Sequence, residues 1–217
     1  MSDGFFVVLE GGDYTGKKVQ SVRLANHILD LSEDNDIVLT HEPTRRAREI
    51  KRKLVEDEDA YSDPRKMAEL YVEDRRLHTE TIIEPNLHQG VTVIANRYAM
   101  STCVYQSLQG MPLSELVDMH QEIEFSLPDL TILLNISPQT ADLRATSRTE
   151  TAESKFEANV EFRNNVYRKY MELASPGEYQ NNFGNVTVVD GNGTIEEVAE
   201  SIRTIFDSVH HHVYDSI

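Results

Sequence analysis

The sequence has few of the features that mark secreted, membrane-spanning or zinc-binding proteins. Cys103 is the only cysteine in 217 residues, which excludes an internal disulfide and a zinc site built from cysteines. No apolar run reaches the length needed to cross a bilayer. The first residues contain no basic segment of the kind that opens a secretion signal. Together these absences predict a cytoplasmic protein.

Positive charge is also scarce. The chain has 21 Lys and Arg residues against 37 Asp and Glu residues, which gives a formal net charge of -16 at pH 7. A field of that sign repels the phosphates of DNA and RNA, so a nucleic-acid-binding function is disfavoured. A small phosphorylated ligand remains compatible with this charge if basic side chains gather around it locally.

Short apolar runs alternate with longer stretches of helical periodicity along the whole chain. Five runs are expected to be strands: 5–10, 37–40, 91–95, 130–136 and 186–189. Helical patterns lie between them, at 17–31, 44–56, 63–88, 99–108, 113–125, 138–148, 154–173 and 194–210. This order predicts an α/β fold, a five-stranded parallel sheet with helices on both faces. Ligands of such sheets bind at the carboxyl ends of the strands.

A glycine-rich loop follows the first expected strand. Gly11, Gly16 and Lys17 satisfy the pattern G-x-x-x-x-G-K, in which backbone amides and the lysine bind a chain of phosphates. The loop lies between an apolar strand and an amphipathic helix, which is the context that this motif requires. The sequence therefore predicts a nucleotide-binding P-loop formed by Gly11, Gly12, Asp13, Tyr14, Thr15, Gly16, Lys17 and Lys18.

Further motifs follow at or just after the ends of the expected strands. They are Glu42-Pro43 with arginines after it, Leu70-Tyr71-Val72-Glu73-Asp74-Arg75 with His78, Asn96-Arg97-Tyr98 with Ser101, Tyr105 and Gln106, and Pro128-Asp129-Leu130 with Arg144 and Arg148. Together with the loop, and in this order, they resemble the motifs of the thymidylate kinase (dTMP kinase) family over nearly the whole chain. The resemblance implies a single P-loop domain over 1–217 of the nucleoside monophosphate kinase type, with a short lid at about 145–157.

On the donor side, the resemblance implies that the loop binds ATP and that four basic residues act on the transferred phosphoryl group. These catalytic residues would be Lys17, Arg97, Arg144 and Arg148. Phosphoryl transfer between two anions needs positive charge on both phosphate groups and along the path between them. Arginine suits this task because its guanidinium group grips phosphate oxygens in a bidentate manner.

On the acceptor side, the resemblance implies a pocket for dTMP. Tyr71 would stack on thymine and Arg75 would bond the base, although Tyr71 on its own is equally compatible with a core position. Asp13 matches the contact to the deoxyribose 3′-hydroxyl, and Arg45 is the best match to the arginine that contacts the acceptor phosphate. Two nearby arginines compete for that last role, Arg46 and Arg48. The other residues expected to contact this nucleotide are Glu42, Pro43, Arg97, Ser101, Tyr105 and Gln106.

Two positions depart from the family pattern, and both concern the metal at the reacting phosphates. Lys18 replaces the Ser or Thr whose hydroxyl holds Mg²⁺, and a charged ammonium group cannot ligate a metal. Asn96 replaces the aspartate of the family's D-R-Y motif, which helps to hold the waters of the magnesium ion. We therefore expect no direct protein ligand to a metal, and Mg²⁺ carried on the phosphates of ATP.

Three functions are consistent with these residues. The favoured one is phosphorylation of dTMP by ATP in an enzyme that, like other members of the family, is expected to be a homodimer. A second is a kinase for another pyrimidine nucleotide such as dUMP. A third is a catalytically weak, nucleotide-binding paralogue. The arginines at acceptor positions favour a kinase, whereas Lys18 and Asn96 favour the paralogue.

Overall fold

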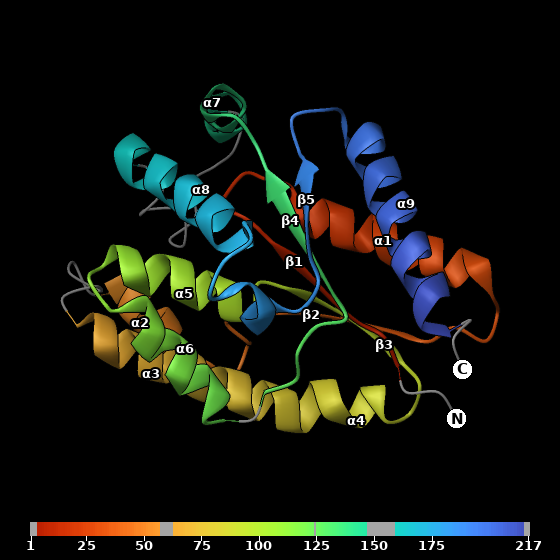
Figure 1. Cartoon of the computed structure of the whole chain (residues 1–217), viewed down its shortest axis with the longest axis horizontal. Coiled ribbons are helices and arrows are strands. Elements are labelled where there is room, and N and C mark those ends of the chain that lie inside the picture. Colours follow the sequence, from red (N-terminus) through yellow and green to blue (C-terminus); the bar gives the residue numbers. More distant parts are fainter. Residues whose placement is uncertain (1–3, 57–62, 124, 147–158, 215–217) are drawn as a thin grey trace.

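The computed structural model describes residues 4–56, 63–123, 125–146 and 159–214, and its centre is a five-stranded parallel sheet (Figure 1). The strands are β1 (Phe6–Glu10), β2 (Ile37–His41), β3 (Thr92–Asn96), β4 (Leu130–Asn135) and β5 (Val186–Asp190). Their order in the sheet is β2-β3-β1-β4-β5, so that β1 lies at the centre between β3 and β4. The predicted five-stranded parallel α/β fold is confirmed.

Helices cover both faces of this sheet (Figure 1). They are α1 (Lys17–Leu31), α2 (Arg48–Glu56), α3 (Pro64–His78), α4 (Glu84–Leu87), α5 (Ala99–Leu108), α6 (Leu113–Gln121), α7 (Pro138–Thr146), α8 (Val160–Ala174) and α9 (Ile195–Tyr214). A π-helical turn joins α3 to α4 (Thr79–Ile83), and a 3₁₀ turn precedes β5 (Gln180–Phe183).

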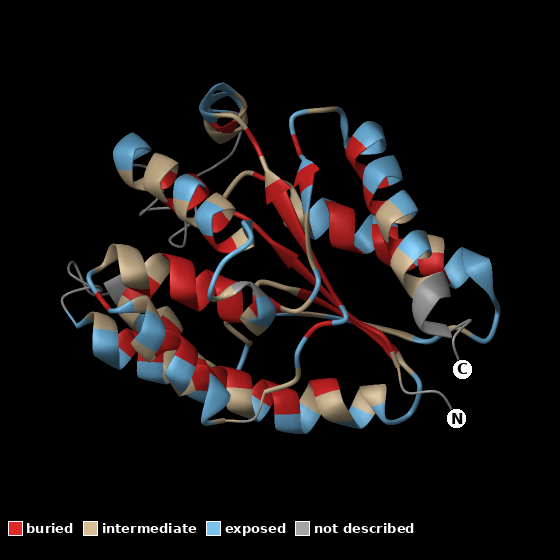
Figure 2. Ribbon diagram, viewed as in Figure 1, coloured by how far each residue is buried: buried red, intermediate tan, exposed pale blue. Residues whose placement is uncertain are grey.

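Strand β1 shows why the sheet has two cores. Val7 and Leu9 pack with α1 and α9 on one face, whereas Phe6 and Val8 pack with α3, α5, α6 and α8 on the other. Side chains of a strand alternate between the two faces of a sheet, so a continuous apolar run is what a strand buried on both sides requires. The strands β1, β3 and β4 are accordingly almost entirely buried (Figure 2).

The sequence misplaced the start of the second helix. A helix was expected from Thr44, but α2 begins at Arg48. The backbone amide and the hydroxyl of Thr44 both donate hydrogen bonds to the carboxylate of Asp74 on α3, at 2.7 and 2.5 Å. This contact fixes Thr44 outside the helix, and α2 begins four residues later.

Helix α3 begins as expected. Asp63 is its N-cap and accepts a hydrogen bond from the amide of Lys66, and Pro64 occupies the first helical position. The helix expected over 63–88, with a bend near Pro85, consists of three consecutive segments, and the π-helical turn lies just before Pro85. Among the described residues, no helix combines the length and the apolar composition needed to span a membrane.

Candidate active site

The P-loop connects β1 to α1, and its glycines are required by close contacts. Gly11 has φ 137°, and a Cβ atom there would lie 2.5 Å from a backbone oxygen of β4. A Cβ atom on Gly12 would lie 2.1 Å from the ring of Tyr167. Gly16 is the N-cap of α1 in the left-handed conformation, with φ 92°. The loop therefore opens the N-terminus of α1 toward an anion, as phosphate binding requires.

Lys17 begins α1 and bends back over the loop. Its ammonium group donates to the carbonyl oxygens of Gly11 and Gly12, at 2.9 and 2.6 Å. These carbonyls hold the charge beside the loop amides, where the terminal phosphates of a nucleotide would bind. The geometry supports the predicted role of Lys17.

Helices α7 and α8 pack against the P-loop. Tyr14 has φ 65° and packs with Ile136, Ala141 and Tyr167. Arg144 donates to the carbonyl oxygen of Tyr14 at 3.1 Å, and also to the carbonyl of Gly191 after β5 at 2.8 Å. The guanidinium group of Arg144 thus joins two loops, a positioning contact that the sequence did not reveal. Arg148 and residues 147–157 of the expected lid lie outside the described residues.

Arg97 lies between the loop and the nucleoside side of the site. It follows β3 with φ 66°, a left-handed conformation that is uncommon outside glycine. Its guanidinium group bonds Asp13 at 2.6 Å and lies 3.3 Å from the carbonyl oxygen of Gly11 and from the hydroxyl of Ser101. It also stacks over the ring of Tyr105, with 5.3 Å between the guanidinium carbon and the ring centroid.

A cavity of about 190 Å³ opens beside Arg97. It brings together nine residues that the sequence predicted for the acceptor nucleotide: Asp13, Glu42, Pro43, Tyr71, Arg75, Arg97, Ser101, Tyr105 and Gln106. Five more residues line it that the sequence missed: His41, Lys51, Leu54, Tyr98 and Thr102. Tyr71 both lines the cavity and packs against the cluster of Ile50, Leu54 and Met67, so its two expected roles are compatible.

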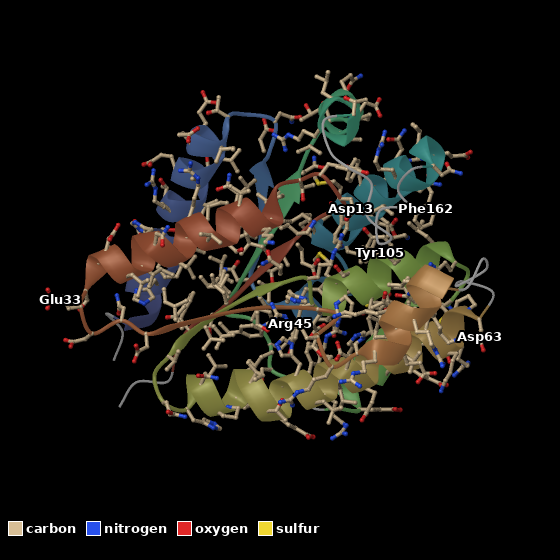
Figure 3. All side chains as sticks on the ribbon, turned by 180° about the vertical axis from the view of Figure 1, so that it is seen from behind. Asp13, Glu33, Arg45, Asp63, Tyr105 and Phe162 are labelled. Atoms are coloured by element: carbon tan, nitrogen blue, oxygen red, sulfur yellow. The ribbon has the colours of Figure 1, made fainter. Side chains whose placement is uncertain are left out.

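Arg45 is placed elsewhere. It lines a second groove between β2 and α3, together with Leu39, Asp74 and Leu77. Figure 3 shows Arg45 apart from Asp13 and Tyr105, and these last two residues line the cavity. The cation that α2 presents to the cavity is instead the half-buried Lys51. Arg45 precedes the start of α2 at Arg48, whereas Lys51 lies within the helix, so the two side chains leave different parts of the chain.

Arg75 is the most deeply buried charge of the cavity wall, with 1% of its surface exposed. It donates to Glu42 at 2.5 Å and to the Thr102 hydroxyl at 3.1 Å, and it lies over the ring of Tyr98, 4.9 Å from the centroid. Glu42 also bonds the Nδ1 of His78, at 2.9 Å. A buried ion pair needs additional hydrogen bonds of this kind to offset the loss of hydration.

Several polar atoms in the wall have no partner among the described residues. Both side-chain polar atoms of Gln106 are in this state, and 1% of Gln106 is exposed. The Nε of Arg75 is a second example. Buried polar atoms are almost always hydrogen-bonded, so these atoms of the cavity-lining residues retain hydrogen-bonding capacity that a polar ligand would use.

Glu10 links the P-loop to α5. Its carboxylate accepts hydrogen bonds from the amides of Tyr98 and Ser101 at 2.7 and 3.1 Å, from the Ser101 hydroxyl at 2.6 Å and from the Tyr170 hydroxyl at 3.1 Å. Burial raises the pKa of Glu10, while the hydrogen bond from Ser101 and the charge of Arg97 oppose this shift. The sequence signal for this role was an acidic residue at the end of an apolar strand.

The two unusual positions near the loop differ in their surroundings. Lys18 is exposed on α1. Asn96 ends β3 and donates to the hydroxyl of Ser21 at 3.0 Å, while its buried Oδ1 has no partner in the described part of the chain. No group of three or more His, Cys, Asp or Glu residues that could hold a metal occurs among the described residues. Asn96 Oδ1 is thus an acceptor beside the loop that would be available to a water of a magnesium ion carried by the nucleotide.

Comparisons with known proteins agree with this geometry. A family model described as thymidylate kinase matches residues 9–202. The thymidylate kinase of Ruegeria pomeroyi is 34% identical over 206 residues, covering 93% of this chain and 94% of the relative. That of Wolbachia pipientis is 31% identical, with 91% and 95% covered. The crystal structure of thymidylate kinase from Ehrlichia chaffeensis has the same fold, with a TM-score of 0.73 at 22% identity and coverage of 94% of this chain and 99% of that one. This chain belongs to the thymidylate kinase family.

Proposed function

We propose that the chain binds dTMP in the cavity beside Arg97 and transfers to it the γ-phosphoryl group of ATP held by the P-loop, giving ADP and dTDP. Membership of the thymidylate kinase family supports this reaction over the dUMP and non-catalytic alternatives. The observation that carries the assignment of the cavity is its pair of unpartnered polar groups, the carboxamide of Gln106 and the Nε of Arg75.

The chemistry of these two groups matches a pyrimidine imide. Arginine donates hydrogen bonds and never accepts them, so Arg75 requires a carbonyl oxygen on the base. Thymine has such an oxygen at position 4, whereas cytosine has an amino group there, which would meet the guanidinium group donor to donor. The carboxamide of Gln106 has one acceptor and two donors, which match the N3–H and a carbonyl of the same ring. Tyr71 would supply an aromatic face for stacking.

The acceptor phosphate would be bound by Lys51 and Arg97. Both line the cavity, Lys51 from α2 and Arg97 from the turn after β3. This proposal gives Lys51 the role that the sequence assigned to Arg45, which lines the separate groove. Asp13 pairs with Arg97 in the structure and would accept a hydrogen bond from the deoxyribose.

During transfer, the charge that develops on the phosphoryl oxygens would be stabilised by Lys17 on the donor side and by Arg97 between the two nucleotides. Arg97 suits the bridging position because it lies 3.3 Å from the P-loop carbonyl of Gly11 and lines the acceptor cavity at the same time. Arg144 would act indirectly, by holding the backbone of Tyr14. Mg²⁺ bound to ATP supplies further positive charge to the phosphate oxygens.

The family resemblance also supports three statements about the whole protein. Residues 1–217 would form one kinase domain, 145–157 would form a lid over the donor, and the enzyme would be a cytoplasmic homodimer. Analytical ultracentrifugation of the purified protein tests the dimer, and a single sedimenting species of 24.7 kDa, the mass of one chain, would contradict it.

The decisive experiment is release of ADP, measured in a coupled assay over a panel of acceptors. We expect the highest kcat/KM with dTMP, a lower value with dUMP and little turnover with dCMP, and dependence on Mg²⁺ in every case. Binding of ATP without turnover of any acceptor would reject the kinase. Preference for dCMP would reject the proposed contact between Arg75 and the base.

A further inference from the structure

Arg75 has a buried partner that does not line the cavity. His120 lies on α6 with 2% of its surface exposed, and its Nε2 is within hydrogen-bond distance of one terminal nitrogen of Arg75. The two residues are 45 positions apart in the chain. No motif led to His120 in the sequence, and the proposed reaction does not use it directly.

The bonding of His120 identifies its tautomer. Because a guanidinium group can only donate, the Nε2 of His120 must be the acceptor. The Nδ1 then carries the proton and donates a hydrogen bond of 2.5 Å to the carbonyl oxygen of Leu116. His120 is therefore a neutral imidazole oriented by its own helix. Burial lowers the pKa of His120 to about 3 and the charge of Arg75 acts in the same direction, so the imidazole stays neutral at physiological pH.

His120 completes the set of groups that orient Arg75. One terminal nitrogen of the guanidinium group bonds Glu42 and Thr102, the other bonds His120, and the ring of Tyr98 lies against its face. The Nε is left without a protein partner in the described structure. With both ends and one face held, the group has little freedom to rotate.

The position of His120 on α6 argues against a packing role alone. Leu116 and Val117 on the same helix are buried and apolar, so an apolar side chain would suffice to fill this part of the core. A buried imidazole is stable here because it satisfies a charged donor that would otherwise have no partner. Removing the acceptor would leave that donor unsatisfied and allow Arg75 to turn toward other oxygens.

We infer that His120 is a positioning residue for base recognition, which holds the Arg75 guanidinium group in the orientation that meets the 4-carbonyl of a pyrimidine. This inference rests on the proposed binding of the base in the cavity. In this role, His120 contributes to the affinity for the acceptor nucleotide and to the discrimination between thymine and cytosine. His120 takes no part in the transfer of the phosphoryl group, so its loss should change KM far more than kcat.

Three variants of the full-length protein test the inference in the ADP-release assay. His120→Phe keeps a ring of similar size but removes the acceptor. His120→Gln keeps an acceptor oxygen near the position of Nε2. Val117→Ala shortens a neighbouring buried side chain of the same helix, and it controls for loosened packing. Thermal unfolding of each variant shows how far stability alone has changed.

For His120→Phe we expect KM for dTMP to rise about tenfold with kcat nearly unchanged, and the preference for dTMP over dCMP to fall, because a hydrogen bond to a charged group is lost. His120→Gln should recover most of both losses, and Val117→Ala should leave KM and the preference unchanged. An unaltered KM in His120→Phe would overturn the inference. So would an equal rise in Val117→Ala, or no recovery in His120→Gln at equal stability. If the unmodified enzyme does not phosphorylate dTMP, that result rejects the proposed function and not the role of His120 alone.

Discussion

Arg97 and Arg75 line the same cavity, but the protein holds them in different ways. The Arg97 side chain is 21% exposed, follows a strand in a left-handed conformation and pairs with Asp13, which is itself partly exposed. Arg75 is 1% exposed, lies within a regular helix and is surrounded by Glu42, Thr102 and His120.

The difference in burial matches a difference in task. An arginine near solvent can shift toward the charge that develops during phosphoryl transfer, so its removal should lower kcat. A buried arginine with a fixed orientation can recognise the shape and polarity of one base. Its loss should raise KM and lower the stability of the protein. Under the proposed function, the phosphate side of this cavity would serve the chemistry and the base side would serve recognition.

The largest expected effect is on stability, at the base side. Glu42→Gln should lower the free energy of unfolding by about 3–5 kcal/mol, because it leaves Arg75 as an uncompensated buried charge. The matched change at the phosphate side is Asp13→Asn, which should lower it by less than about 1 kcal/mol because that pair is partly exposed. Urea unfolding of both variants measures the contrast. Equal losses would show that burial does not distinguish the two arginines.

At the phosphate side the expected effect is on rate. Arg97→Ala should lower kcat by about 10²–10³-fold, as loss of one donor to a developing oxyanion does, while stability changes little. Arg168→Ala, on the exposed face of α8, is the matched control and should leave kcat unchanged. A loss confined to KM would mean that Arg97 binds the acceptor without acting in the transition state.

Lys51 and Arg45 offer a direct test of where the acceptor phosphate lies. Lys51→Ala should raise KM for dTMP by roughly tenfold or more, because a hydrogen bond between charged groups is lost. Arg45→Ala should have a much smaller effect, since Arg45 lines the other groove. The reverse result in steady-state kinetics would place the phosphate at Arg45, as the sequence suggested.

The pH dependence of stability reports on the neutral imidazole beside Arg75. Because the folded pKa of His120 is lowered from 6.5 to about 3, the unfolded chain binds more protons between these values. Stability from this group is therefore complete above pH 6.5 and is lost as pH falls, by about 1.4 kcal/mol per unit. Unfolding at pH 7.5 and 5.5 should show this loss in the wild type and its absence in His120→Gln. Identical pH profiles would mean that His120 is protonated in the folded state.

The smallest expected effect concerns the metal. Lys18→Ser combined with Asn96→Asp restores a hydroxyl and a carboxylate near the loop, and should raise magnesium-dependent kcat about threefold, a change of under 1 kcal/mol. The titration of kcat with Mg²⁺ measures this increase. The contacts of Arg97 and Arg75 should not change. A fall in activity would show that the pair Lys18 and Asn96 is adapted to the reaction.

Much of this architecture was predictable from local patterns. The apolar run of β1, the glycines of the loop and the helix after it are neighbours in the chain, so their joint motif predicts their geometry. Arg97 was found for a similar reason, because it directly follows the strand β3. Nine of the ten residues predicted to contact the acceptor nucleotide line one cavity, and Arg45 is the exception.

The residues that the sequence missed act across long separations. His120 is 45 positions from Arg75, and Thr102 is 27. Glu10 bonds Ser101, 91 positions away. Lys51 was missed because arginines nearer to Pro43 were better matches to the motif, and no local pattern shows that α2 begins only at Arg48.

By itself, the sequence determined the order of strands and helices, the P-loop and the set of cationic residues near the strand ends, since these depend on side-chain periodicity and on residues close in the chain. Only the tertiary structure decided which arginine is buried and which is near solvent, and which cation of the α2 region reaches the cavity. Burial and the choice of partners are set by the packing of distant helices on the sheet, and the periodicity of one helix does not specify which residues of another will cover it.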